Sequence, residues 1–267
     1  MNKITLLVAC LISTFTFSDT LLHVGNLIDV SSGEISKAVT IRISGNKIES
    51  ITKGYAKTKS EDQVINLKQS FVLPGFMDMH VHLAGEYVPK AERPSKVEPE
   101  FSALFAANSA KKTLMAGFTT VRNLGDGGME TIALRKAISE GLMVGPRIFT
   151  SGKTIATTGG HGDPTNGMSK DSYSPPTPKQ GVIDSPNDAI KAVRQRYKDG
   201  ADGIKITVTG GVLSEAKSGS NPQFTQEEVN AVVNAAKDYG MWVAVHAHGA
   251  EGMKRAIRAG VDSIEHG

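Results

Sequence analysis

The sequence predicts an α/β protein, with a small N-terminal β module before an incomplete TIM-like (β/α)8 barrel. Short β-type runs separated by turn residues fill the chain up to residue 70. From Phe71 onward, apolar β-branched runs alternate with helix-length segments, which is the pattern of β/α units around a parallel sheet. We count six such units in residues 71–267, whereas a closed barrel needs eight. We therefore expect a fragment that is truncated after the sixth barrel strand.

Residues 1–18 have the organisation of a secretory signal peptide. Lys3 supplies a positive charge, an apolar run extends from Ile4 to Ile12, and small residues lead to a cleavage site after Ser18. The run is shorter than the roughly 20 residues of a membrane-spanning helix, so we expect no stable membrane span. The competing interpretation is a first strand or buried helix. The pattern favours a periplasmic or secreted protein.

The single cysteine, Cys10, lies within this signal segment. Leu7 to Cys10 resembles a lipoprotein cleavage box, which makes lipidation an alternative, although the apolar stretch before it is short. Cleavage after Ser18 would leave no cysteine, and would therefore exclude disulfides and thiolate metal ligands. The 30 basic and 27 acidic residues form no basic run or helix face, so nucleic acid is not an expected partner.

Three β-type runs follow the signal segment, at Leu21–Asp29, Val39–Ile43 and Lys47–Ile51. The Gly45-Asn46 pair between the last two is typical of a hairpin turn. We expect residues 19–70 to form a small antiparallel module.

Six later runs have the apolar composition of buried parallel strands. They are Val72–Met79, Thr119–Leu124, Arg147–Ser151, Gly203–Thr209, Trp242–Ala247 and Asp262–Glu265. Two helix starts are marked by capping residues, Ser185 before Pro186 and Thr225 three residues before Glu228. The Gly- and Pro-rich segment 153–181 is too long for a simple connection, and we expect it to cover a binding site.

Histidines mark the carboxyl ends of three predicted strands. His80 and His82 lie two residues apart, so their side chains share one side of the strand and could hold one metal ion. His246 and His266 end the fifth and sixth barrel strands. Because the carboxyl ends of barrel strands converge on the active-site face, we expect these imidazoles to meet. A structural role for the His80 and His82 pair is the alternative.

Lys205 lies among β-branched apolar residues in a strand that should be buried on both faces. An unpaired ammonium is costly there, and burial lowers its pKa. The neutral amine could combine with carbon dioxide to form a carbamate, an anionic oxygen ligand able to bridge two metals. The alternatives are an ion pair with a carboxylate or a side chain that extends to the surface.

Two further histidines are candidates for substrate contacts. His248 shares the strand face of His246 but lies further into the loop, which favours a supporting or substrate contact over metal ligation. His161 lies in a glycine-rich run of the long loop, where it could approach a ligand or simply face solvent.

The segments that carry these residues match the motifs of a known family. They are Leu73–His82, Thr119–Asp126, Thr158–Asp163, Gly203–Lys205, His246–Gly249 and Glu265–Gly267. Together they resemble the amidohydrolase superfamily, specifically the imidazolonepropionase-related branch that includes secreted Xaa-Pro dipeptidases and Xaa-Arg or Xaa-Lys carboxypeptidases. The resemblance implies a metal-dependent hydrolase of amide or peptide bonds in dipeptides or N-acyl amino acids. It also implies that residues 19–70 are the N-terminal part of a small β-sandwich domain.

A binuclear centre, usually zinc, is what this resemblance implies for the site. His80 and His82 would bind one metal ion, and His246 and His266 the other. A carboxylated Lys205 would bridge the two ions, and a bridging hydroxide would be the nucleophile. The family's proton shuttle is an aspartate at the end of the eighth strand, which the expected six units do not include, so no catalytic acid is identified.

Two alternatives to this function stay open. An imidazolonepropionase-like cyclic amide hydrolase resembles a mononuclear site without the bridging lysine, so Lys205 argues against it. A non-catalytic metal-binding remnant is the alternative from a different class. The substrate side chain, the metal and the formation of a homo-oligomer are not determined by the sequence.

Overall fold

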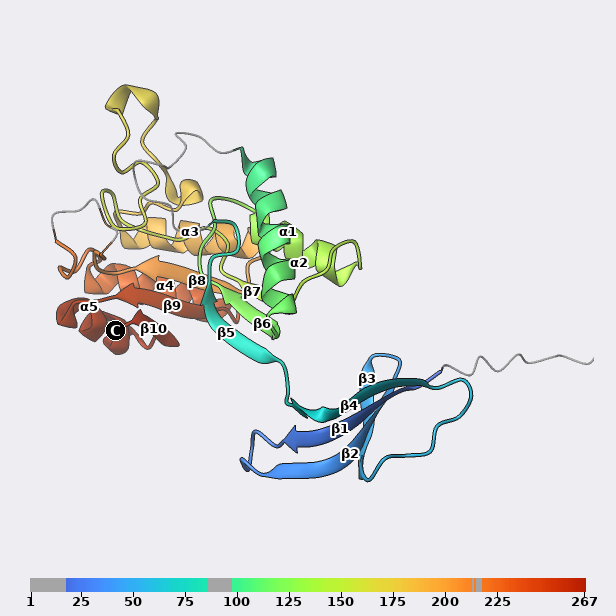
Figure 1. The fold of residues 1–267 in the computed structure, drawn as a ribbon. Helices are drawn as coiled ribbons and strands as arrows, with labels where there is room; N and C mark the ends of the chain where they lie inside the picture. The colour runs from blue at the N-terminus through green and yellow to red at the C-terminus, as the bar shows by residue number, and fades with distance from the viewer. Residues whose placement is uncertain (1–17, 86–97, 213, 215–217) are drawn as a thin grey trace, which may run out of the picture. The chain divides into compact units, whose positions relative to one another are not determined.

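The computed structural model describes residues 18–85, 98–212, 214 and 218–267. The chain divides into two compact units, Met1–Pro74 and Gly75–Gly267, whose elements are labelled in Figure 1. Nearly all of the predicted signal peptide, residues 1–17, falls outside the described residues. Within the described part of the chain, no helix has the length and apolar character needed to cross a bilayer.

The N-terminal unit contains one mixed sheet with the strand order β3-β2-β1-β4. Its strands are β1 (Thr20–Ile28), β2 (Ile35–Ser44), β3 (Lys47–Lys53) and β4 (Gln63–Val72). β2 pairs antiparallel with both β1 and β3, whereas β4 pairs parallel with β1. The predicted hairpin turn is confirmed, because Ser44 pairs with Lys47 and Gly45 between them has a φ of 58°.

Two expectations for this region are wrong. β4 is absent from the predicted strands, and its parallel pairing makes the sheet mixed instead of antiparallel. The strand predicted at Val72–Met79 is divided between the end of β4 at Val72 and a new strand that begins at Phe76. Pro74 explains the break, because proline has no N–H to donate to a strand ladder. β4 therefore continues past residue 70, where the domain boundary is expected from sequence.

The C-terminal unit alternates strands and helices, as predicted. Its strands are β5 (Phe76–Val81), β6 (Phe118–Asn123), β7 (Arg147–Thr150), β8 (Gly203–Thr207), β9 (Trp242–Ala247) and β10 (Ser263–His266). Its helices are α1 (Pro99–Met115), α2 (Glu130–Ser139), α3 (Pro186–Asp199), α4 (Gln226–Asp238) and α5 (Ala250–Ala259). The strands pair in parallel in the orders β5-β6-β7 and β8-β9-β10.

Ile155 connects these two parallel sheets. Its amide donates to the carbonyl of Lys205 at 2.8 Å, and its own carbonyl accepts from the amide of Thr207 at 3.2 Å. The segment after β7 therefore runs beside β8. Helices contact both sheets, with α1 on β6, α2 on β7, α3 on β8, and α4 and α5 on β9.

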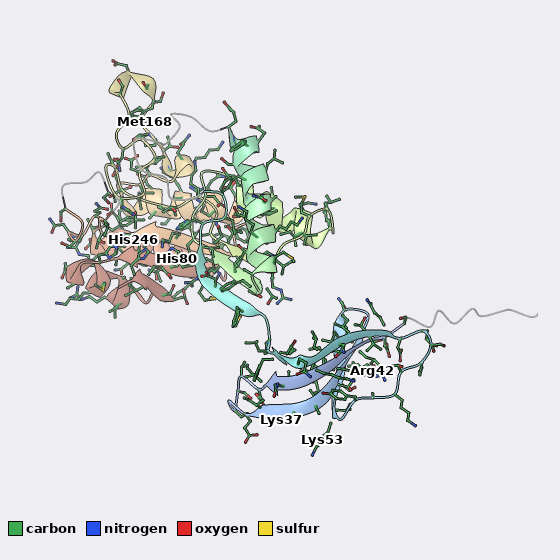
Figure 2. The ribbon with its side chains drawn as sticks, viewed as in Figure 1. Lys37, Arg42, Lys53, His80, Met168 and His246 are labelled. Carbon is green, nitrogen blue, oxygen red and sulfur yellow. The ribbon has the colours of Figure 1, made fainter. Side chains whose placement is uncertain are left out.

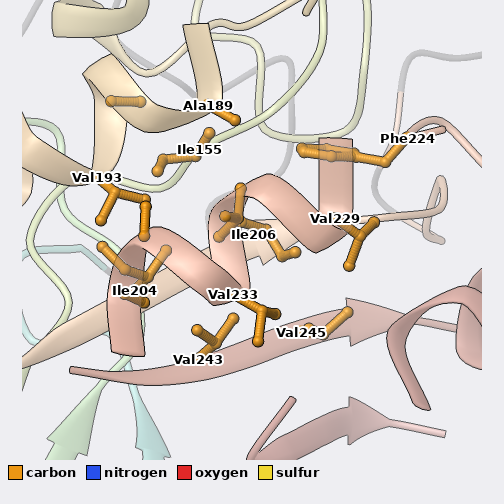
Figure 3. Close-up of a cluster of buried hydrophobic side chains, with 14 of the residues drawn as sticks. Ile155, Ala189, Val193, Ile204, Ile206, Phe224, Val229, Val233, Val243 and Val245 are labelled. Atoms are coloured by element: carbon orange, nitrogen blue, oxygen red, sulfur yellow. The ribbon is translucent and has the colours of Figure 1, made fainter. Parts of the chain in front are cut away.

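The largest apolar core lies between the strands β8 and β9 and the helices α3 and α4 (Figure 3). Ile204 and Ile206 of β8 are fully buried in this core, together with Val243 and Val245 of β9. Successive side chains of a strand point to opposite faces. The packing of Ile204 and Ile206 against the helices therefore directs Lys205 to the opposite, inner face of the sheet.

Both predicted helix starts are confirmed. The Ser185 hydroxyl accepts from the amide of Asp188 at 3.2 Å at the start of α3. At the start of α4, the Thr225 hydroxyl accepts from the amide of Glu228 at 3.2 Å, and the Glu228 carboxylate accepts from the amide of Thr225 at 2.8 Å. These bonds satisfy amides that the first helical turn leaves without partners.

The helical turns of the long loop before α3 are the short 3₁₀ turns Lys170–Ser172 and Pro178–Gln180. The buried guanidinium of Arg196 binds both ends of this loop. Its Nε donates to the carbonyl of Lys153 at 2.8 Å, and its Nη2 donates to that of Lys179 at 3.2 Å. The loop is thus attached to α3 at its base.

Candidate active site

Six of the protein's seven histidines line a single cavity of ≈ 750 Å³. They are His80, His82, His161, His246, His248 and His266. Lys205 also lines this cavity, so every residue that the sequence predicts for metal or substrate binding meets there. Figure 2 shows two of these side chains, His80 on β5 and His246 on β9.

His80 on β5 and His82 directly after β5 have the spacing of two ligands on one metal ion. The Nε2 atoms of His80 and His82 are 3.3 Å apart. Two nitrogens bound to a tetrahedral zinc at about 2.0–2.1 Å lie about 3.3–3.4 Å apart. His82 Nδ1 lies 3.4 Å from the carbonyl of Gly125, and His80 Nδ1 lies 2.9 Å from a Glu265 oxygen. Because both Nδ1 atoms face oxygen acceptors, the two Nε2 lone pairs are free for a metal.

In the same cavity, the ring of His266 lies next to that of His246, with centroids 4.7 Å apart, and next to that of His80, with centroids 4.9 Å apart. His246 Nε2 lies 2.9 Å from the carbonyl of Gly210. A carbonyl can only accept, so Nε2 donates and the lone pair of the neutral ring is on Nδ1. Nδ1 is therefore the atom through which His246 can bind a metal.

The cavity lowers the pKa values of the four imidazoles proposed as metal ligands. Burial, together with the nearby charge of Lys205, lowers the pKa of His80 to about 4. Burial lowers the pKa of His246 to about 3, and it also lowers the pKa values of His82 and His266. Metal binding requires neutral imidazole, so these four side chains are in the binding form.

Lys205 is only 4% exposed, and no described residue forms a hydrogen bond with its Nζ. Burial lowers its pKa to about 8. Within the described residues it forms no ion pair, because the nearby carboxylate of Glu265 is bound by other groups. The geometry thus opposes both alternatives from sequence, a carboxylate partner and a surface position. A buried amine without a partner fits the predicted carbamate.

Within the described residues, no group of three or more His, Cys, Asp or Glu side chains already has the arrangement of a complete metal site. The His80 and His82 pair nevertheless has ligand spacing, and Lys205 could supply oxygen ligands in the same cavity only after carboxylation. The residues therefore fit divalent ions in their chemistry and in the spacing of one pair.

The two predicted substrate residues lie in loops, His161 in the long loop before α3 and His248 directly after β9. The ring of His161 stacks on His246 with centroids 4.2 Å apart, and its Nδ1 lies 2.5 Å from the hydroxyl of Ser214. His248 stacks on His266 at 5.2 Å. Gly211 permits the stacking of His161 on His246, because a Cβ at Gly211 would lie 2.8 Å from the His246 ring. His161 therefore faces the cavity and not open solvent.

Arg122 and Glu265 support the site but are absent from the predicted residues. Arg122 Nη2 donates to Glu265 at 2.6 Å, and the same carboxylate contacts His80. Both residues carry a charge within a parallel strand of the predicted barrel, which is part of the signal that identifies Lys205. Applied to β6 and β10, that signal could have found them.

Asp126, three residues after the end of β6, gives a prediction of pH-dependent stability. Burial raises its pKa to about 6, although Asn123 donates to it at 2.8 Å. The folded state then binds the proton more tightly than the unfolded state, so this contribution to stability is complete below pH 4 and is lost as pH rises through about 6. We expect the stability of wild type relative to Asp126→Asn to fall by roughly 2–3 kcal/mol between pH 4 and pH 7 in urea unfolding. An equal difference at both pH values would contradict this.

Comparisons with known proteins agree with this geometry. The model of the amidohydrolase family matches residues 71–267. Ochratoxinase from Aspergillus niger is 32% identical over 209 residues, which are 73% of this chain and 43% of that protein. A crystal structure of a Xaa-Pro dipeptidase with methionine bound in its active site has a TM-score of 0.90 and 62% identity, over 94% of this chain and 62% of that one.

A crystal structure of a prolidase with bound N-methylphosphonate-L-proline has a TM-score of 0.80 and 32% identity, over 94% of this chain and 61% of that one. The chain therefore spans less than two thirds of the length of each of these relatives.

Proposed function

This chain belongs to the amidohydrolase family, and we propose that it is part of a periplasmic or secreted metal-dependent hydrolase of amide bonds in Xaa-Pro dipeptides or N-acyl amino acids. The observation that carries the proposal is the meeting of six histidines and an unpartnered, buried Lys205 in one cavity. The 62% identity to a Xaa-Pro dipeptidase supports the substrate class.

In this proposal, His80 and His82 would hold one divalent ion through their Nε2 atoms, and His246 and His266 would hold a second. Lys205, as a carbamate, would place one oxygen toward each ion. Two such ions, zinc in our proposal, would polarise the scissile carbonyl and lower the pKa of the attacking water. The chain's own contribution is to supply neutral imidazoles and a buried amine whose lowered pKa favours carboxylation.

We propose that His161 and His248 contact the substrate. Neutral imidazole can donate to a carboxylate or carbonyl oxygen and accept from an amide. Both side chains line the cavity beside the proposed metal ligands. Its volume of ≈ 750 Å³ lies within the range of pockets that hold small molecules, which suits a dipeptide.

The strands β5 to β10 are, in our proposal, the first six of eight β/α units, and residues 19–70 are the N-terminal part of a β-sandwich domain. The shares of the solved relatives that this chain spans, 62% and 61%, leave room for two further units. The acid that shuttles the proton would come from the eighth.

The test is hydrolysis by the complete protein that carries this chain, with Met-Pro and other Xaa-Pro dipeptides and a matched panel of N-acyl amino acids. We expect turnover that is lost on dialysis against a metal chelator and restored by Zn²⁺, because water activation depends on the bound ions. Liberated proline and amino acid are measured by chromatography. Metal-loaded protein that hydrolyses neither panel would overturn the proposal.

A further inference from the structure

Glu265 on β10 is a buried carboxylate to which the proposed function gives no role. It is 7% exposed. Its Oε1 accepts from Arg122 Nη2 at 2.6 Å and from the Ser263 hydroxyl at 2.7 Å, and its Oε2 lies 2.9 Å from His80 Nδ1. One carboxylate therefore joins the charged group of β6 to the proposed metal ligand of β5.

The ion pair with Arg122 determines the direction of the bond between Glu265 and His80. Arg122 Nη2 donates to Glu265 Oε1 at 2.6 Å, and because a guanidinium is always charged, its partner is held as a carboxylate. An ionised carboxylate can only accept hydrogen bonds, so His80 Nδ1 is the donor. The neutral ring then carries its lone pair on Nε2, which faces His82 Nε2 at 3.3 Å.

Arg122 is itself held by several groups. Its Nε donates to the carbonyl of Met79 at 2.7 Å, and its Nη1 donates to Ser263 at 3.1 Å. Its guanidinium carbon lies 5.5 Å from the ring centroid of Trp242, within the range of a cation–π contact. The rigid guanidinium fork thus fixes Glu265 relative to the backbone beside His80, which a flexible lysine would not do.

We propose that Arg122 and Glu265 are positioning residues that hold the imidazole of His80 in the tautomer and orientation needed to bind a metal through Nε2. The inference rests on the proposed function and deepens it, because it names the residues that set the affinity of one metal position. His82 has a weaker partner, the neutral carbonyl of Gly125 at 3.4 Å. The orientation of the His80 imidazole therefore depends on the carboxylate of Glu265.

Glu265→Gln is the discriminating variant, because it keeps the shape of the side chain and replaces one acceptor oxygen with a donor NH₂. Arg122 has only donors to offer, so the remaining amide oxygen turns toward it. The NH₂ group then faces His80 Nδ1, which must accept, and the ring proton moves to Nε2. That tautomer has no lone pair on the metal-binding nitrogen.

Glu228→Gln is the matched control. Glu228 is as buried as Glu265, at 6% exposed, but its carboxylate accepts from the amide of Thr225 at the start of α4. A role limited to stability predicts similar losses of unfolding temperature for both variants and unchanged metal affinity. A positioning role predicts loss of metal affinity in Glu265→Gln alone.

The experiment measures Zn²⁺ affinity by competition with a chelator, and the His80 tautomer by ¹⁵N NMR of the metal-free protein. We expect Zn²⁺ affinity to fall by about 10- to 100-fold in Glu265→Gln and to stay unchanged in Glu228→Gln. The ring proton should be on Nδ1 in wild type and on Nε2 in Glu265→Gln. A ring proton on Nε2 in wild type, or equal Zn²⁺ affinity in wild type and Glu265→Gln, would overturn the inference.

These readouts separate the inference from the proposed function. A wild-type protein that binds no Zn²⁺ would refute the metal-dependent hydrolase. The tautomer of the metal-free protein would still decide whether Glu265 positions His80.

Discussion

Replacement of Lys205 by alanine should remove at least one divalent ion per molecule and lower kcat/KM by more than about 100-fold. Lys205 lies among the histidines of the cavity, and no described residue binds its Nζ. A carbamate at this position would be the shared ligand of both ions, so its loss affects both. Metal content by inductively coupled plasma mass spectrometry and hydrolysis of a Xaa-Pro dipeptide are the measurements.

The control for Lys205→Ala is Lys191→Ala, which removes an exposed lysine of α3 that pairs with Asp188 at 3.2 Å. This variant should keep full metal content and activity, since surface ion pairs contribute little. Lys205→Ala should also unfold at nearly the wild-type temperature without metal, because its Nζ makes no hydrogen bond to a described residue. Full metal content and activity in Lys205→Ala would refute the carbamate.

Replacement of Arg196 by methionine should lower the free energy of unfolding by about 3–5 kcal/mol. The guanidinium is 2% exposed, pairs with Asp199 at 3.2 Å, and donates to the carbonyls of Lys153 and Lys179 at the two ends of the long loop. Methionine fills much of the same volume but leaves these acceptors without the donors that the guanidinium supplies. Urea unfolding at neutral pH measures the loss.

Arg194→Met, on the exposed face of the same helix, is the comparison for Arg196→Met. It should change the free energy of unfolding by less than about 0.5 kcal/mol. The loop attached by Arg196 carries His161, so Arg196→Met should also raise KM more than it lowers kcat. Equal stability of the two variants would show that the buried guanidinium does not hold the loop.

The positions of the proposed metal ligands could be predicted from sequence because they follow from local rules. A two-residue period places His80 and His82 on one side of a strand, and the ends of β9 and β10 place His246 and His266 at the same edge of the sheet. Burial of Lys205 follows from its β-branched neighbours. The structure brings these predicted residues together in one cavity.

The remaining features depend on contacts between distant segments, which local patterns do not contain. Arg122 meets Glu265 only because β6 and β10 face each other across the inner side of the sheets. The parallel pairing of β4 with β1 likewise depends on a strand partner far along the chain. The stacking of His161 on His246 requires the loop to fold back over β9, which its composition alone does not determine.

The most direct test of the proposed centre is the ratio of divalent metal to protein in the active, complete protein, measured by inductively coupled plasma mass spectrometry after exhaustive dialysis against metal-free buffer. We expect about two ions per molecule, because four imidazoles and Lys205 line the same cavity and would supply the ligands of two ions. Active protein that holds one ion or none would contradict the binuclear centre.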